Sequence, residues 1–178
     1  MTTPAVGDLL RDGELAGSWT LDAGKSSVQL RTRHTWGLLQ LVGAFTEFSG
    51  SGTIAKDGTV SGVFTVKAAS VETRNPRRDK HLRSADFFHA EKHPQAVLTI
   101  TSARPAGPAD LECQGTFEAA GHARPVSFTA HIDEATAQAV VLTAELEVDR
   151  TEFDMTWSPM RIASMAAHGT VRARFVRA

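Results

Sequence analysis

The sequence has 178 residues, which suits one domain with its own core, because a chain of this length buries roughly two-thirds of its unfolded surface. Hydrophobic residues make up 42% of the chain and charged residues 22%, the ordinary range of soluble proteins. The net charge of -1 lacks the basic excess of nucleic-acid-binding proteins, so nucleic acid is not expected as a partner.

The start of the chain is predicted to be an N-terminal extension, residues 1–17, that precedes a single domain at 18–178. The extension carries charged residues from Asp8 to Glu14 and has no apolar run of signal-peptide length. No later stretch approaches the roughly 20 apolar residues of a transmembrane helix. We therefore expect a cytoplasmic protein without a transmembrane segment.

Alternation of apolar and polar side chains is the dominant pattern, and it predicts strands with one buried face. The expected strands are 18–21, 28–36, 47–54, 60–66, 96–102, 111–117, 126–132, 140–149 and 170–176. Turn residues separate them, among them Asp57-Gly58 and Asp133-Glu134. Eight or nine strands at this spacing indicate a barrel or a sandwich, and a barrel leaves no exposed sheet edge.

The polar stretch 75–92 breaks the alternation. It opens with Asn75 and Pro76, a good N-cap and first-turn pair, and apolar residues then recur every third position from Leu82. One or two short helices are expected near 76–92.

The histidines are candidate metal ligands, because His81, His89 and His93 lie close together in the sequence. No standard zinc spacing such as H-E-x-x-H is present, so a polar helix surface is the preferred interpretation and no metal or other cofactor is expected. The sequence also lacks a G-x-S-x-G elbow, a P-loop and a G-x-G-x-x-G fingerprint. No catalytic residue is assigned.

A basic cluster accompanies the predicted helices and consists of Arg74, Arg77, Arg78, Lys80 and Arg83. One interpretation is a solvated surface paired with the interleaved Asp79 and Asp86. The other is a cationic mouth that engages a phosphate or pyrophosphate headgroup through charge-assisted hydrogen bonds. His34, beside Trp36 on the apolar face of its strand, is similarly either a hydrogen-bonded core residue or a polar group that faces a cavity.

The aromatic residues either fill a core or line a cavity. A barrel of about eight strands is plugged by its side chains or is just wide enough for one slender ligand. Small residues at inward positions, namely Gly62, Ala130, Ala144 and Ala173, would leave room. The single cysteine, Cys113, lies in an alternating stretch and is expected to be buried and inert.

Six segments, taken in order, carry a specific resemblance. They are WTLDAGKSSVQLRTRH (19–34), GAFTEFSG (43–50), ASVET (69–73), RDKHLRSADFFHAEKHP (78–94), GTFEAAGHARPVSF (115–128) and VDRTEF (148–153). Together they resemble the YceI-like family over roughly residues 18–176. Asp154 departs from the pattern, because glycine is common there, and 160–167 has less glycine than in many relatives. Many relatives also carry an export signal.

The resemblance implies an all-β, extended, lipocalin-like antiparallel barrel with a helix at one end and a polyisoprenoid in its tunnel. It implies a carrier or scavenger of isoprenoid quinone or polyprenyl pyrophosphate, and it leaves a homodimer open. The residues expected to line the tunnel are Trp36, Phe45, Phe64, Leu82, Phe87, Phe88 and Phe128, with His34, Arg78 and His81 nearer its polar end. Two alternatives remain: an enzyme that uses His34 or the group His81, His89 and His93, and an interaction module with a plugged barrel.

Overall fold

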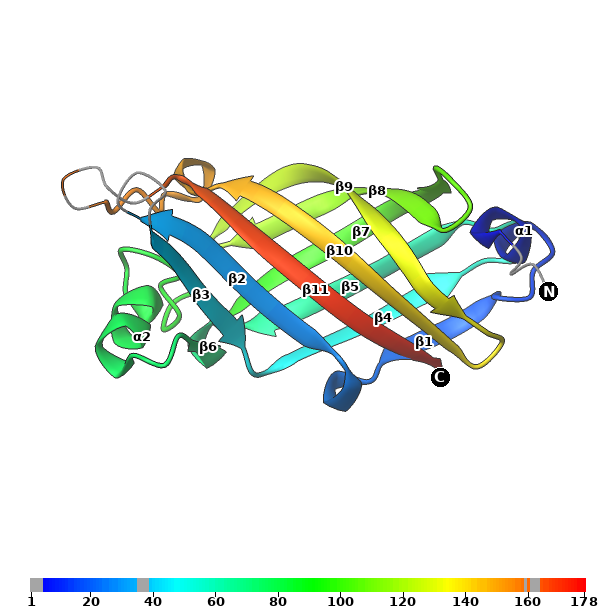
Figure 1. Cartoon of the computed structure of the whole chain (residues 1–178), viewed down its shortest axis with the longest axis horizontal. Coiled ribbons are helices and arrows are strands. Elements are labelled where there is room, and N and C mark those ends of the chain that lie inside the picture. Colours follow the sequence, from blue (N-terminus) through cyan, green and yellow to red (C-terminus); the bar gives the residue numbers. More distant parts are fainter. Residues whose placement is uncertain (1–4, 35–38, 159, 161–163) are drawn as a thin grey trace.

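Antiparallel strands form most of the molecule, and a short α-helix lies at each end (Figure 1). The computed structural model describes residues 5–34, 39–158, 160 and 164–178. The helices are α1 (Val6–Arg11) and α2 (Pro76–Arg83). The strands are β1 (Gly17–Leu21), β2 (Ser27–His34), β3 (Leu39–Phe45), β4 (Phe48–Ile54), β5 (Val60–Lys67), β6 (Val71–Glu72), β7 (Gln95–Pro105), β8 (Asp110–Ala119), β9 (His122–Ala135), β10 (Ala139–Asp149) and β11 (Ala166–Arg177).

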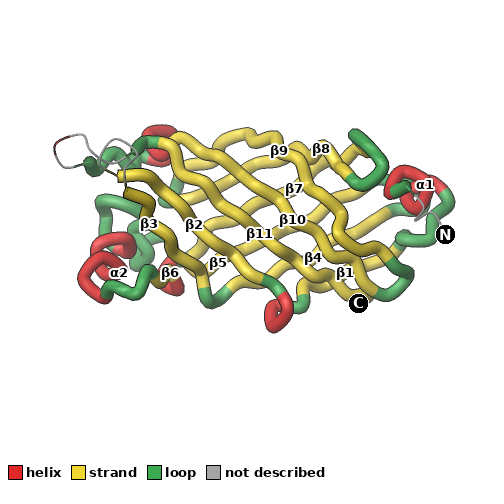
Figure 2. The backbone as a smooth tube through the Cα atoms, viewed as in Figure 1, coloured by secondary structure: helices red, strands yellow, loops and turns green. Residues whose placement is uncertain are grey.

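Eight strands close a ring in the order β1-β4-β5-β7-β8-β9-β10-β11, and β11 pairs back to β1. The strand β11 is long enough to pair with both β1 and β2, which follow one another along it and are separated by a 3₁₀ turn, Ala23–Lys25. On their other edges, β2 pairs with β3 and β1 pairs with β4 (Figure 2). The predicted fold class, an extended antiparallel barrel of about eight strands with a helix near 76–92, is confirmed.

The two-residue alternation gives the barrel an apolar inner face. On β10, for example, Leu142, Ala144 and Leu146 point inward, and they lie opposite Ala173, Val171 and Gly169 of β11. Irregularities in β7 and β9 insert an extra residue, which keeps apolar side chains inward on both sides of each β-bulge.

The bulge in β7 also explains why residue 115 of β8 is a glycine. A Cβ atom on Gly115 would lie 1.8 Å from the carbonyl oxygen of Thr99, so only glycine fits beside the bulge.

Two groups of buried side chains occupy the two ends of the barrel. At the α1 end, Val6, Leu9 and Leu10 pack with Trp19 and Ile132. At the other end the buried cluster is Val28, Phe45, Val66, Val71, Leu82, Ala96, Ala119, Phe153 and Met155. The hydrophobic core is therefore divided between the ends.

Several sequence predictions need correction. The segments α1, β3 and β6 were not predicted, and Asp133-Glu134 is a bulge inside β9, with the turn at 136–138. The helix after Asn75 ends at Arg83, because Ser84 and the residues after it form hydrogen-bonded turns instead. None of the helices in the described ranges is long and apolar enough to cross a bilayer.

Candidate ligand cavity

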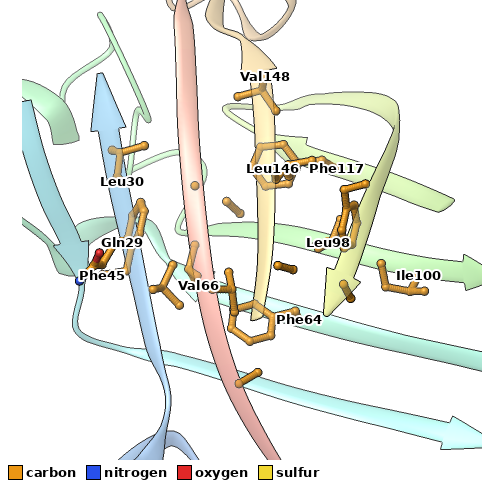
Figure 3. A pocket seen from close by; sticks show the side chains of 18 of the residues that line it. Gln29, Leu30, Phe45, Phe64, Val66, Leu98, Ile100, Phe117, Leu146 and Val148 are labelled. Carbon is orange, nitrogen blue, oxygen red and sulfur yellow. The ribbon is translucent and has the colours of Figure 1, made fainter. Parts of the chain in front are cut away.

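A cavity of about 980 Å³ occupies the middle of the barrel, between the two buried clusters. This volume lies at the upper end of the roughly 300–1,000 Å³ that small-molecule sites enclose. Figure 3 shows side chains from several strands around this space, including Leu30 of β2, Phe64 of β5, Leu98 of β7 and Leu146 of β10. The lining is almost entirely apolar, so the cavity suits a ligand that is apolar along most of its length.

Small residues keep the interior open. All four that were expected at inward positions line the cavity: Gly62, Ala130, Ala144 and Ala173. Gly62 lies directly opposite Gly52 of β4, so neither strand projects a side chain there. A Cβ atom on Gly169 would have no neighbour closer than 3.8 Å, apart from the residues next to it in the chain. The barrel is hollow, and the plugged-barrel alternative is wrong.

Most of the expected tunnel residues line this cavity: Phe45, Phe64, Leu82, Phe87, Phe88, Phe128, Arg78 and His81. Their part in binding a ligand remains a prediction. His34 is the last residue of β2 and pairs in register with Leu39; its side chain and the whole of Trp36 lie outside the described residues.

The cavity opens near α2, where residues of its lining reach the surface. Leu39 is 62% exposed and Trp157 is 39% exposed, and Arg77 is also exposed. Figure 1 places β3 and α2 at this same end of the barrel. We call this end the mouth, and define it by Leu39, Arg77, Arg78, His81 and Trp157.

Helix α2 is fixed at the mouth by its N-terminal residues. The Asn75 side chain accepts a hydrogen bond from the Arg78 backbone N–H at 3.2 Å, which confirms the predicted N-cap. The buried Asp79 carboxylate accepts from the backbone N–H of Thr73 at 2.8 Å and from its hydroxyl. Arg78 in turn donates from Nε to the Thr73 hydroxyl and from Nη2 to the Thr73 carbonyl, both at 2.8 Å. These contacts leave further N–H groups of Arg78 at the mouth.

The basic residues do not pair with Asp79 and Asp86, contrary to one interpretation of the sequence. Asp79 pairs with Thr73, and Asp86 pairs with His81. Arg83 donates to the carbonyls of residues 69 and 71. Within the described ranges, none of the five basic side chains forms an ion pair with a carboxylate, so no direct contact neutralises their positive charges.

Aromatic rings surround His81. Its ring meets Trp157 edge-on at 4.4 Å and Phe87 at 5.2 Å between centroids, while Nε2 lies 2.8 Å from Oδ2 of Asp86. Trp157 was not among the residues expected to line the tunnel, although it lines the cavity. The contacts hold the imidazole in one orientation at the mouth.

Arg150 is a second residue that sequence reasoning missed, although it lies in the VDRTEF segment. It lines the cavity but is only 6% exposed, and burial lowers the pKa of its guanidinium, an effect that the charge of Asp149 opposes. Nε and Nη2 donate to the Ser164 carbonyl, and Nη1 donates to the carbonyls of Met155 and Trp157. The cation is thus held by backbone dipoles, and it lies 5.6 Å from the Phe87 ring centre.

Cys113 lines the cavity and is buried, as predicted. Desolvation raises the pKa of its thiol to about 11, from an ordinary value of 9.0. The thiolate fraction at pH 8 is then lower by about a hundredfold, although the greater nucleophilicity of a more basic thiolate offsets part of this. We expect iodoacetamide to label the native protein at least roughly tenfold more slowly than the urea-unfolded protein. An equal rate for the two forms would contradict a desolvated thiol.

The three histidines His81, His89 and His93 do not gather into one cluster. Among the residues that the structure describes, no three His, Cys, Asp or Glu side chains come together as potential ligands. The rings of His89 and His93 do touch, at 5.7 Å between centroids, but neither residue lines the cavity as His81 does.

Comparison with known proteins identifies the family. A sequence model described as the YceI-like domain matches residues 19–176. A UPF0312 protein of Shewanella baltica is 34% identical over 112 residues, which cover 62% of this chain and 58% of the relative. The protein YceI of Escherichia coli O157:H7 is 36% identical over 107 residues, which cover 59% and 55%. These matches thus span little more than half the length of the curated relatives.

Solved structures share the fold at low sequence identity. Burkholderia cenocepacia BcnA is 19% identical with a TM-score of 0.77, covering 86% of this chain and 98% of that one. A structure described as a polyisoprenoid binding domain from Saccharophagus degradans is 14% identical with a TM-score of 0.74, covering 90% and 98%. Because the family model matches nearly the whole barrel, and the fold and hollow interior agree with it, the chain belongs to the YceI-like family.

Proposed function

We propose that this protein binds and carries a long apolar molecule, an isoprenoid lipid such as an isoprenoid quinone or a polyprenyl pyrophosphate, in its barrel. The observation that carries the proposal is the cavity of about 980 Å³, enclosed by inward apolar side chains. The polyisoprenoid binding domain of Saccharophagus degradans, which has the same fold, supports this class of ligand.

The energetics of apolar burial favour such a ligand. Removing apolar surface from water contributes roughly 25 cal/mol per Å², so a chain that buries several hundred Å² gains on the order of 10 kcal/mol. Loss of translational and rotational freedom offsets part of this gain. The remainder is sufficient for stable binding without a covalent bond.

The mouth suits the polar end of the ligand. Arg77 and Arg78 supply positive charge without a paired carboxylate among the described residues, and they border a largely apolar lining. A phosphate or pyrophosphate would accept charge-assisted hydrogen bonds from them, and a quinone carbonyl would accept fewer. The tail would then extend along the barrel axis toward α1.

Carriage is favoured over catalysis, because the lining is almost entirely apolar. The raised pKa of the Cys113 thiol keeps this potential nucleophile protonated, and the Arg150 guanidinium is already engaged by backbone carbonyls. The enzyme alternative has no comparable support. Residence in the cytoplasm and a homodimer stay predictions.

Native mass spectrometry tests the proposal directly. We expect the protein purified under mild conditions to carry an additional mass that organic extraction removes, and the extract to contain an isoprenoid. The extracted protein should bind the same lipid again at a stoichiometry of one. A protein that carries no lipid and takes up none of the isoprenoids offered would contradict the proposal.

A further inference from the structure

The end of the cavity opposite the mouth is closed by the N-terminal segment. Val6 and Leu10 of α1, together with Leu15, line the cavity, and each is at most 4% exposed. Figure 1 shows α1 at this end of the barrel and α2 at the other. We call these three side chains the floor.

Helix α1 is held against the loops of the barrel. The Val6 backbone N–H donates to the Pro108 carbonyl in the β7–β8 loop at 2.9 Å. Leu10 packs against Gly58 in the β4–β5 turn so closely that a Cβ atom there would lie 3.1 Å from the Leu10 carbonyl oxygen. Gly58 also has a φ of +85°, so two constraints favour glycine at this position.

The segment that follows α1 is fixed as firmly. The Trp19 indole Nε1 donates to the Leu15 carbonyl at 2.9 Å. Arg177, at the end of β11, donates to the carbonyls of Glu14 and Ala16 and places its guanidinium 4.8 Å from the Trp19 ring centre. Contacts from two loops and the last strand therefore hold the floor against the end of the barrel.

The family match begins at residue 19, so the floor is built by residues that precede the family domain. We propose that the floor sets the greatest length of apolar chain that the barrel accepts. This inference rests on the proposed function: a tail that enters at the mouth stops at Val6 and Leu10, and every further carbon must remain outside in water. At about 30 Å³ for each group the size of a water molecule, the cavity holds on the order of thirty carbon atoms.

Linear primary alcohols that differ by one methylene measure this limit. For the full-length protein we expect the affinity to rise by about fourfold for each methylene that enters the cavity, because each buried methylene contributes about 0.8 kcal/mol. The affinity should stop rising at one chain length, which is the break point. Leu10→Ala should move the break point to longer alcohols by about two or three carbons, the size of the side chain that is removed. Val6→Ala should move it by a smaller amount.

Leu9→Ala is the matched control, because Leu9 is a buried leucine of the same helix that does not line the cavity. It should destabilise the helix without moving the break point. Val6→Phe should move the break point to shorter alcohols, and circular dichroism would verify that each variant is folded. An unchanged break point in both Val6 variants, or a shift in Leu9→Ala equal to that in Leu10→Ala, would overturn the inference and leave the proposed function intact. If the unaltered protein binds no alcohol of any length, the proposed function itself fails.

Discussion

Gly169→Phe is expected to abolish binding of the apolar ligand while the barrel remains folded. Gly169, the fourth residue of β11, faces the cavity, and a Cβ atom there meets nothing beyond ordinary van der Waals contact. The benzyl side chain would take the place of about seven ligand carbons, and at about 0.8 kcal/mol for each buried methylene the affinity should fall by up to about 10,000-fold. Replacing a strand glycine with an aromatic residue should itself favour the fold by up to about 1 kcal/mol.

Displacement of a fluorescent fatty-acid probe would measure this loss, and thermal unfolding would measure stability. Thr170→Phe is the matched control, since Thr170 is the next residue of the same strand and points to the outer face, where it pairs with Glu145. We expect the control to keep the affinity of the unaltered protein. Equal binding by both variants would show that the ligand does not occupy the barrel interior.

The strands of the barrel and the start of α2 could be predicted from the sequence, because the patterns that mark them involve only neighbouring residues. The strand β10 alternates apolar and polar residues from Leu142 to Asp149, and Asn75 with Pro76 marks the start of α2. The predicted end of α2 was wrong, because three-residue spacing of apolar side chains also occurs in the turns after Arg83. The sequence therefore predicted where this helix begins but not where it ends, because its end depends on packing against the rest of the barrel.

The elements that were missed have weaker local signals. In β3 the sequence LQLVGAF has Gln40 as its one polar residue, so the alternating burial of the strand has no polar–apolar pattern in the sequence, and Leu39 and Val42 are both exposed. The helix α1 has only six residues, too few for a periodic pattern, although Val6, Leu9 and Leu10 have the i, i+3, i+4 spacing of a helix face. That spacing was the one available sign of the floor.

The open interior could not be predicted from the sequence in the same way. Inward alanines and glycines such as Ala144 and Gly169 occur in plugged and hollow barrels alike, and only the pairing of strands shows whether large side chains face them. Here Gly52 lies opposite Gly62, and Leu146 lies opposite Gly169. Both pairings depend on register between strands, which is a property of the closed ring.

Replacing Arg150 with methionine is expected to lower the stability of the fold by about 3 kcal/mol. The substitution leaves the carbonyls of Met155, Trp157 and Ser164 without their shared donor, and an unsatisfied buried carbonyl costs about 1–3 kcal/mol. Removing the desolvated charge recovers part of that loss, so the net effect is smaller than the sum. For a chain of this size the Tm should fall by roughly 6–12 °C.

Arg150→Lys separates charge from geometry, because lysine keeps a positive charge but cannot donate to three carbonyls in the planar arrangement of a guanidinium. We expect it to be nearly as unstable as Arg150→Met. Arg172→Met is the control, since Arg172 is an exposed arginine on β11 and surface substitutions usually change stability by less than about 0.5 kcal/mol.

Because Arg150 also contacts Phe87 at the cavity wall, both Arg150 variants should bind the apolar ligand more weakly. Urea unfolding midpoints for Arg150→Met and Arg172→Met that agree within error would show that the carbonyls do not depend on this arginine.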